Sequence, residues 1–141
     1  MGVPRPPARR RPLETIGDGG ELVRRFYQAA IPDPQLGPIF HAFNVDWSVH
    51  IPKLTAFWAR EILGEPGYSG RPVGAHGPVL DRRAFGRTEI DRWLELWGET
   101  VDELFIGETA EFAKRRAALA GDAIASLARR HASGRSFPLG A

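Results

Sequence analysis

The sequence predicts an all-α protein with one globular domain. Apolar residues recur at helical spacing in four segments, and no stretch is convincing as a strand. The chain has 141 residues, of which 43% are hydrophobic, and this is enough to bury a single core. We therefore expect four main helices packed around one core, within residues 18–132.

The two ends of the chain are expected to lie outside this domain. The first 13 residues are rich in Pro and contain four of the 19 Lys+Arg residues but no acid, so residues 1–17 should form a disordered basic arm. The tail 133–141 should fray. Without the first 13 residues, 15 Lys+Arg residues remain against 17 Asp+Glu residues, which argues against a nucleic-acid-binding surface.

Composition also excludes several kinds of site. The chain has no Cys, so disulfides, thiolate metal sites and covalent haem attachment are excluded, and any metal would need His, Asp or Glu. No apolar run approaches the roughly 18 residues that a membrane span needs, and no apolar stretch follows the N-terminal arginines as a secretory signal would require. We expect a cytoplasmic protein with no membrane span.

The first helix should begin near Asp18, because Asp18 and Glu21 have the spacing of a capping box. Tyr27 lies at the edge of the apolar face of this helix, and two prolines after Ile31 should end the helix. The apolar residues of that face are Leu22, Val23, Phe26 and Ala30. The connection that follows, residues 36–43, is apolar and turn-rich.

The central helix is expected at residues 46–62, where one face is apolar except for His50. The simplest interpretation of His50 is a core histidine that bonds a backbone carbonyl, because a buried imidazole needs a partner. Pro52 should remove one backbone hydrogen bond from this helix and can kink it. The apolar members of the face are Leu54, Phe57, Trp58 and Ile62.

The connection at residues 64–78 holds five Gly and three Pro, so regular structure is not expected there. It carries His76, which by itself would be interpreted as a solvent-facing loop residue. A helix with Ile90, Trp93, Leu94 and Trp97 on its apolar face follows and ends at Gly107. The last helix, 109–130, should turn six residues inward. They are Phe112, Leu119, Ala120, Ala123, Ile124 and Leu127.

Five short motifs occur in order between residues 20 and 130. They are Phe26-Tyr27; Leu36-Gly37-Pro38-Ile39-Phe40; Trp47-x-x-His50 with Phe57-Trp58; Tyr68-x-Gly70-x-Pro72-x-x-x-His76; and Trp93-Leu94-x-Leu96-Trp97. Together, at this spacing, they resemble the truncated haemoglobins of the third group. The resemblance implies a two-over-two helical sandwich around haem.

The resemblance also implies roles for individual residues. His76 would be the proximal ligand of the iron in a non-covalent haem b, and Tyr27, His50 and Trp93 would line the distal side, where O2, NO or CO binds. The residues expected to surround the haem are Phe26, Phe40, Leu54, Phe57, Trp58 and Trp97.

The expected distal set favours chemistry on the bound ligand over simple oxygen transport. Each neutral hydrogen bond to the ligand contributes about 0.5–1.5 kcal/mol, so two or three would slow its release. The resulting hypothesis is NO dioxygenation or peroxide activation, served by an unidentified reductase. Two alternatives remain. A non-haem metal enzyme using His50 and His76 would need carboxylates such as Glu61 as further ligands, but Glu61 lies eleven residues, or three helical turns, from His50 and cannot share its metal. The other alternative is a helical regulatory or interaction module without a cofactor.

Overall fold

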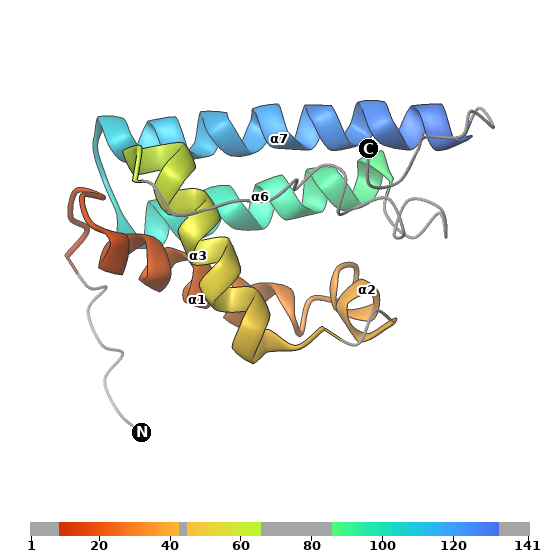
Figure 1. Ribbon diagram of the computed structural model, residues 1–141, viewed down its shortest axis with the longest axis horizontal. Coiled ribbons are helices and arrows are strands. Elements are labelled where there is room, and N and C mark those ends of the chain that lie inside the picture. The colour runs from red at the N-terminus through yellow and green to blue at the C-terminus, as the bar shows by residue number, and fades with distance from the viewer. Residues whose placement is uncertain (1–8, 43–44, 66–85, 133–141) are drawn as a thin grey trace, which may run out of the picture.

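The computed structural model describes residues 9–42, 45–65 and 86–132, with side chains to Ser126 at its C-terminal end. These residues form helices and no strand, apart from one isolated bridge, which confirms the all-α prediction. The helices, labelled in Figure 1, are α1 (Ile16–Ala30), α2 (Gly37–Ala42), α3 (Trp47–Leu63), α6 (Arg87–Leu104) and α7 (Glu108–Ala132).

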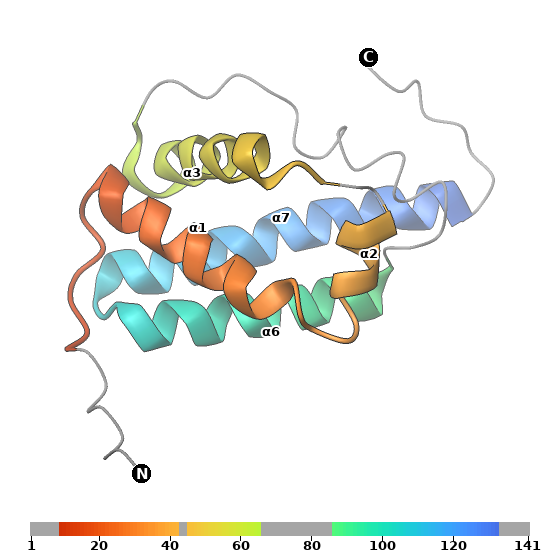
Figure 2. The same cartoon turned by 90° about the horizontal axis from the view of Figure 1, so that it is seen from below.

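The four long helices form two crossed pairs. Helices α6 and α7 lie side by side and antiparallel, and α1 and α3 pack on each other and cross them (Figures 1 and 2). Helix α1 contacts α6, while α3 contacts α7. This is the two-over-two sandwich that the sequence analysis expected. Helix α2 is a short addition at one end of α1.

The chain ahead of α1 departs from the expected disordered arm. Leu13 is only 1% exposed. Arg11 pairs through its backbone with the turn between α6 and α7, donating to the Leu104 carbonyl at 3.3 Å and accepting from the Ile106 N–H at 3.0 Å. The prediction of disorder is therefore wrong for residues 9–17. The reason is that the buried Leu13 side chain and the backbone hydrogen bonds of Arg11 hold this segment in place, and composition alone reveals neither.

The cap of α1 also lies three residues earlier than expected. Thr15 is the N-cap, and Asp18 occupies the N3 position of the capping box rather than the N-cap position. Burial by itself would raise the pKa of Asp18, but hydrogen bonds from the Glu14 backbone and from Arg11 outweigh burial and lower this pKa to about 2. Glu21, the expected partner of Asp18, bonds Arg11 instead.

Helix α7 buries only part of the face that was expected. Ile124 is buried and Phe112 packs against the core as predicted, whereas the side chain of Leu127 lies outside the described residues. The buried positions of α7 against α6 are mainly small, and a Cβ placed on Gly121 would lie 3.1 Å from Ile90. Small residues let α7 approach the large Trp97 of α6, whose indole N–H donates to the Ala113 carbonyl at 3.3 Å. Leu119, predicted inward, is 58% exposed as a result. Ala123 is also exposed.

The connection after α1 contains a short helix where only turns were expected. Its first residue is Gly37, whose N–H donates to the Asp33 carbonyl at 2.8 Å. A Cβ at Gly37 would collide with the backbone carbonyl oxygen of Ile31, so no larger residue fits without a backbone shift. This close approach fixes the direction in which α2 leaves α1.

We predict that Gly37→Ala lowers the free energy of unfolding by about 1–3 kcal/mol, because the added methyl must displace backbone rather than a flexible side chain. Urea denaturation followed by circular dichroism measures the change. The matched control is Gly98→Ala within α6, where a Cβ would meet nothing closer than 3.9 Å. That control should be neutral or stabilising, and equal losses in both variants would contradict the prediction.

Candidate functional site

Tyr27, near the end of α1, carries a buried hydroxyl that no residue of the described ranges bonds. The residue is 8% exposed, and burial raises its pKa. Within the described part of the chain, no donor or acceptor bonds this hydroxyl. Buried hydroxyls are almost always bonded, so this one indicates a place where a ligand can supply the missing partner.

Two other helices bring polar and aromatic side chains against Tyr27. Its ring centroid lies 4.8 Å from that of Trp47 and 5.9 Å from that of His50, both on α3. Phe40 of α2 lies 5.6 Å away. The structure therefore brings together two of the predicted distal residues, Tyr27 and His50. Trp47, which the sequence analysis used only as part of a motif, belongs to the same group, and its position three residues before His50 could have indicated this.

The third predicted distal residue, Trp93, lies in a neighbouring group of rings. It stacks on Trp97 at 6.0 Å and on Trp58 at 6.2 Å. Phe26 connects the two groups, because its ring lies 6.1 Å from Trp93 and 4.9 Å from Tyr27. Trp93 is half-buried, and its indole N–H has no acceptor within the described residues.

The six residues expected to surround the haem differ in how deeply they are buried. Phe26 and Trp97 are each only 1% exposed and pack in the core between α1, α3 and α6. Phe57 and Trp58 are also buried, whereas Leu54 and Phe40 are half-buried at the edge of the core. Contact of these six with a cofactor stays a prediction. Pro52 lies within α3, and the helix continues past it from Trp47 to Leu63.

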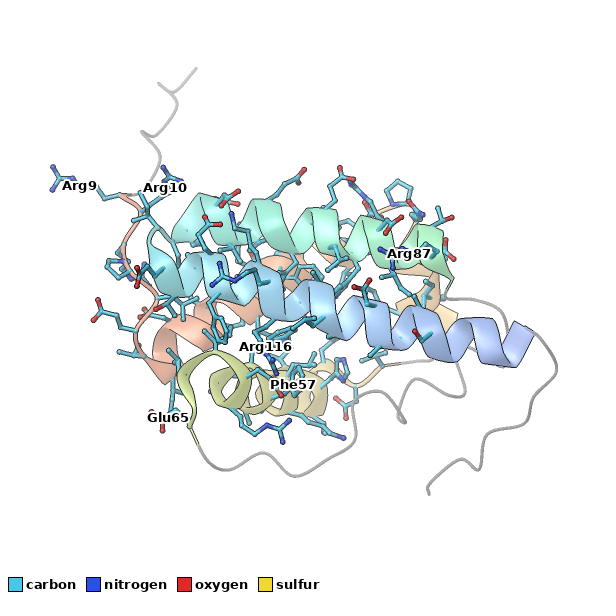
Figure 3. All side chains as sticks on the ribbon, turned by 90° about the horizontal axis from the view of Figure 1, so that it is seen from above. Arg9, Arg10, Phe57, Glu65, Arg87 and Arg116 are labelled. Carbon is cyan, nitrogen blue, oxygen red and sulfur yellow. The ribbon has the colours of Figure 1, made fainter. Side chains whose placement is uncertain are left out.

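A charged cluster joins α3 to α7 beside these rings. Arg116 of α7 reaches toward α3 near Phe57 and pairs with Glu61 (Figure 3). Glu61 also accepts from Arg60 at 2.9 Å. Burial raises the pKa of Glu61, but the bonds from Arg116 and Arg60 outweigh this and lower it. A carboxylate held by two guanidinium groups is a poor metal ligand, which counts against the non-haem alternative.

His76, the expected iron ligand, lies outside the described residues, as do all positions from 66 to 85. In the parts of the chain that the structure does describe, no three His, Asp or Glu side chains are grouped so that they could hold a metal ion. Within the same ranges, none of the helices has the length and apolar character needed to cross a membrane.

Comparison with known proteins decides the family. No family model matches the chain. Over 111 residues it is 32% identical to a group 3 truncated haemoglobin, ctb, of Campylobacter jejuni, and the match covers 74% of this chain and 85% of that protein. The chain belongs to the group III truncated haemoglobins. The crystal structure of a group III truncated haemoglobin from the same organism matches with a TM-score of 0.76 at 26% identity, covering 87% of this chain and 98% of that one.

This truncated haemoglobin is therefore a haem globin that binds gases. The described residues fit a haem on their own account. A buried hydroxyl without a partner lies beside a histidine and among aromatic rings from α1, α2 and α3. An apolar wall with one or two hydrogen-bond donors is the usual environment of a small diatomic ligand on haem.

Proposed function

We propose that this truncated haemoglobin binds non-covalent haem b through His76 and holds a diatomic ligand with Tyr27, His50 and Trp93, to support ligand chemistry rather than oxygen transport. The observation that carries the proposal is the buried Tyr27 hydroxyl, which no described residue bonds. Haem supplies the iron that takes O2, NO, CO or peroxide and exchanges electrons with it.

Tyr27 is suited to donate because its hydroxyl is already out of water. A buried hydroxyl without a partner has lost its hydration and gained nothing in return. A ligand that accepts its hydrogen bond removes this penalty, so the bond stabilises the complex more than an exposed hydroxyl would. A phenol is protonated at neutral pH even at its ordinary pKa, and burial raises the pKa of Tyr27 further, so the hydroxyl is able to donate.

His50 supplies a group that can hold or move a proton beside Tyr27. An imidazole is the side chain whose ordinary pKa lies nearest to neutrality, and the two rings are 5.9 Å apart. The Trp93 indole adds a donor that cannot accept. Strong retention of the ligand next to a proton donor favours NO dioxygenation or peroxide activation, with electrons from a reductase partner, over reversible carriage.

We predict that Tyr27→Phe raises the rate of O2 dissociation by about 2- to 10-fold, the equivalent of one neutral hydrogen bond. Stopped-flow replacement of O2 by CO measures this rate. Thr100→Val is the matched control, because it also deletes a buried hydroxyl, one that bonds the Leu96 carbonyl within α6 at 2.7 Å. The control should leave the rate unchanged. A change below twofold in Tyr27→Phe would remove Tyr27 from the ligand donors.

We predict that His76→Gly loses tight haem binding and that added imidazole restores it, because a free imidazole can take the place of the lost side chain. The haem content after gel filtration and the Soret band measure the outcome. His41→Ala, which alters an exposed histidine at the end of α2, should retain full haem. Unchanged haem content and an unchanged ferrous spectrum in His76→Gly would exclude His76 as the iron ligand.

A further inference from the structure

The turn between α1 and α2 holds a carboxylate that is almost completely buried. The Asp33 side chain is 3% exposed. One carboxylate oxygen accepts from the backbone N–H groups of Gln35 and Leu36, each at 3.0 Å. These bonds close the turn that leads into α2. An Asp side chain that accepts from the backbone N–H groups two and three residues later in the chain is common in such turns.

The other oxygen of Asp33 is held from α6. Arg92 donates to it from Nε at 2.9 Å and from Nη2 at 2.7 Å, and its third nitrogen bonds Glu95 at 2.8 Å. A guanidinium that donates through two nitrogens fixes direction as well as distance. The buried charge of Asp33 therefore has one cationic partner, and that partner orients the turn against α6.

One end of this ion pair determines where Phe40 lies. Leu36, bonded by Asp33, is 1% exposed, and its carbonyl accepts from the Phe40 N–H at 3.5 Å in the first turn of α2. Helix α2 makes no extensive contact with the long helices among the described residues, so the turn held by Asp33 is one of its attachments, together with the packing of Ile39 and Phe40 against the core. Phe40 in turn contacts the rings of Tyr27 and Trp47.

The other end of the ion pair adjoins Trp93. Arg92 is the residue before Trp93 on α6, so a guanidinium anchored to Asp33 limits rotation and sliding of the helical turn that carries the indole. The ion pair thus connects the segment that carries Phe40 with the segment that carries Trp93, two of the residues proposed to lie around the haem and its ligand. The two partners are 59 residues apart in the sequence.

We propose that Asp33 and Arg92 are positioning residues that set the placement of Phe40 and Trp93 around the ligand, an inference that rests on the proposed function. A second ion pair gives the contrast. Arg25 and Glu103 also connect α1 to α6, at 3.1 Å, and Arg25 precedes Phe26 as Arg92 precedes Trp93, but both side chains of this pair are well exposed. An exposed pair contributes little to either stability or geometry.

The experiment compares Arg92→Gln with the control Arg25→Gln in the CO-bound ferrous holoprotein. Arg92→Lys is the conservative variant, which keeps the charge but loses the two-nitrogen contact. Asp33→Asn breaks the same ion pair from its other side. This variant removes the buried charge, whereas Arg92→Gln leaves that charge without its cation, so Asp33→Asn is expected to fold even if Arg92→Gln does not. Three properties are measured: the stretching frequency of CO, the rate of CO dissociation, and the NMR signal of the Trp93 indole N–H, which is identified by its loss in Trp93→Phe. The chain has four Trp, so the indole region is simple.

Arg92→Gln and Asp33→Asn are expected to shift both signals and to change CO dissociation by about threefold or more, while Arg92→Lys gives a smaller shift and Arg25→Gln none. A loss of stability in Arg92→Gln and Asp33→Asn with both signals unmoved would overturn the inference and make the pair purely structural.

Tyr27→Phe, measured in parallel, separates the two proposals. If it moves the CO frequency and the Asp33 and Arg92 variants do not, the inference fails and the proposed function stands. If the wild-type protein takes up no haem, both fail.

Discussion

Two consecutive aromatic residues of α1, Phe26 and Tyr27, connect the two halves of the sandwich. Successive helical residues point about 100° apart, so the two rings face different neighbours. Phe26 is enclosed against Trp93 and Trp97 of α6, while Tyr27 faces α2 and α3. Because Phe26 is locked in the core, the helix cannot rotate, and the Tyr27 hydroxyl is held among rings rather than in water.

The buried polar residues show why Tyr27 stands out. Asp33 accepts from two backbone N–H groups and from Arg92, and Thr100 donates to a carbonyl of its own helix. Asp33 and Thr100 therefore each form hydrogen bonds in the folded protein that replace the hydrogen bonds they lose to water. Tyr27 does not, within the described residues. Among the described residues, the indole N–H of the buried Trp58 also has no acceptor. The Tyr27 hydroxyl differs from that indole because it lies beside His50, and this is why we propose Tyr27 as the ligand donor.

Periodicity was sufficient to predict the four long helices, because apolar spacing of three and four residues is a local property. It predicted only part of the buried face of α7, since that face also depends on how closely small residues such as Ala113 let Trp97 approach. Nor did it find the anchoring of Leu13 or the pairing of Asp33 with Arg92, which join segments far apart in the sequence and leave no local pattern. The grouping of Tyr27 with His50 was available only from the resemblance.

We propose that the Tyr27 hydroxyl and the His50 side chain act on an external ligand bound to haem iron. The absorption spectrum of the reduced, ligand-free protein is the most direct test. We expect a Soret band and visible bands of five-coordinate, high-spin ferrous haem, which change on addition of CO. A six-coordinate, low-spin spectrum, with His50 occupying the sixth position, would contradict this proposal.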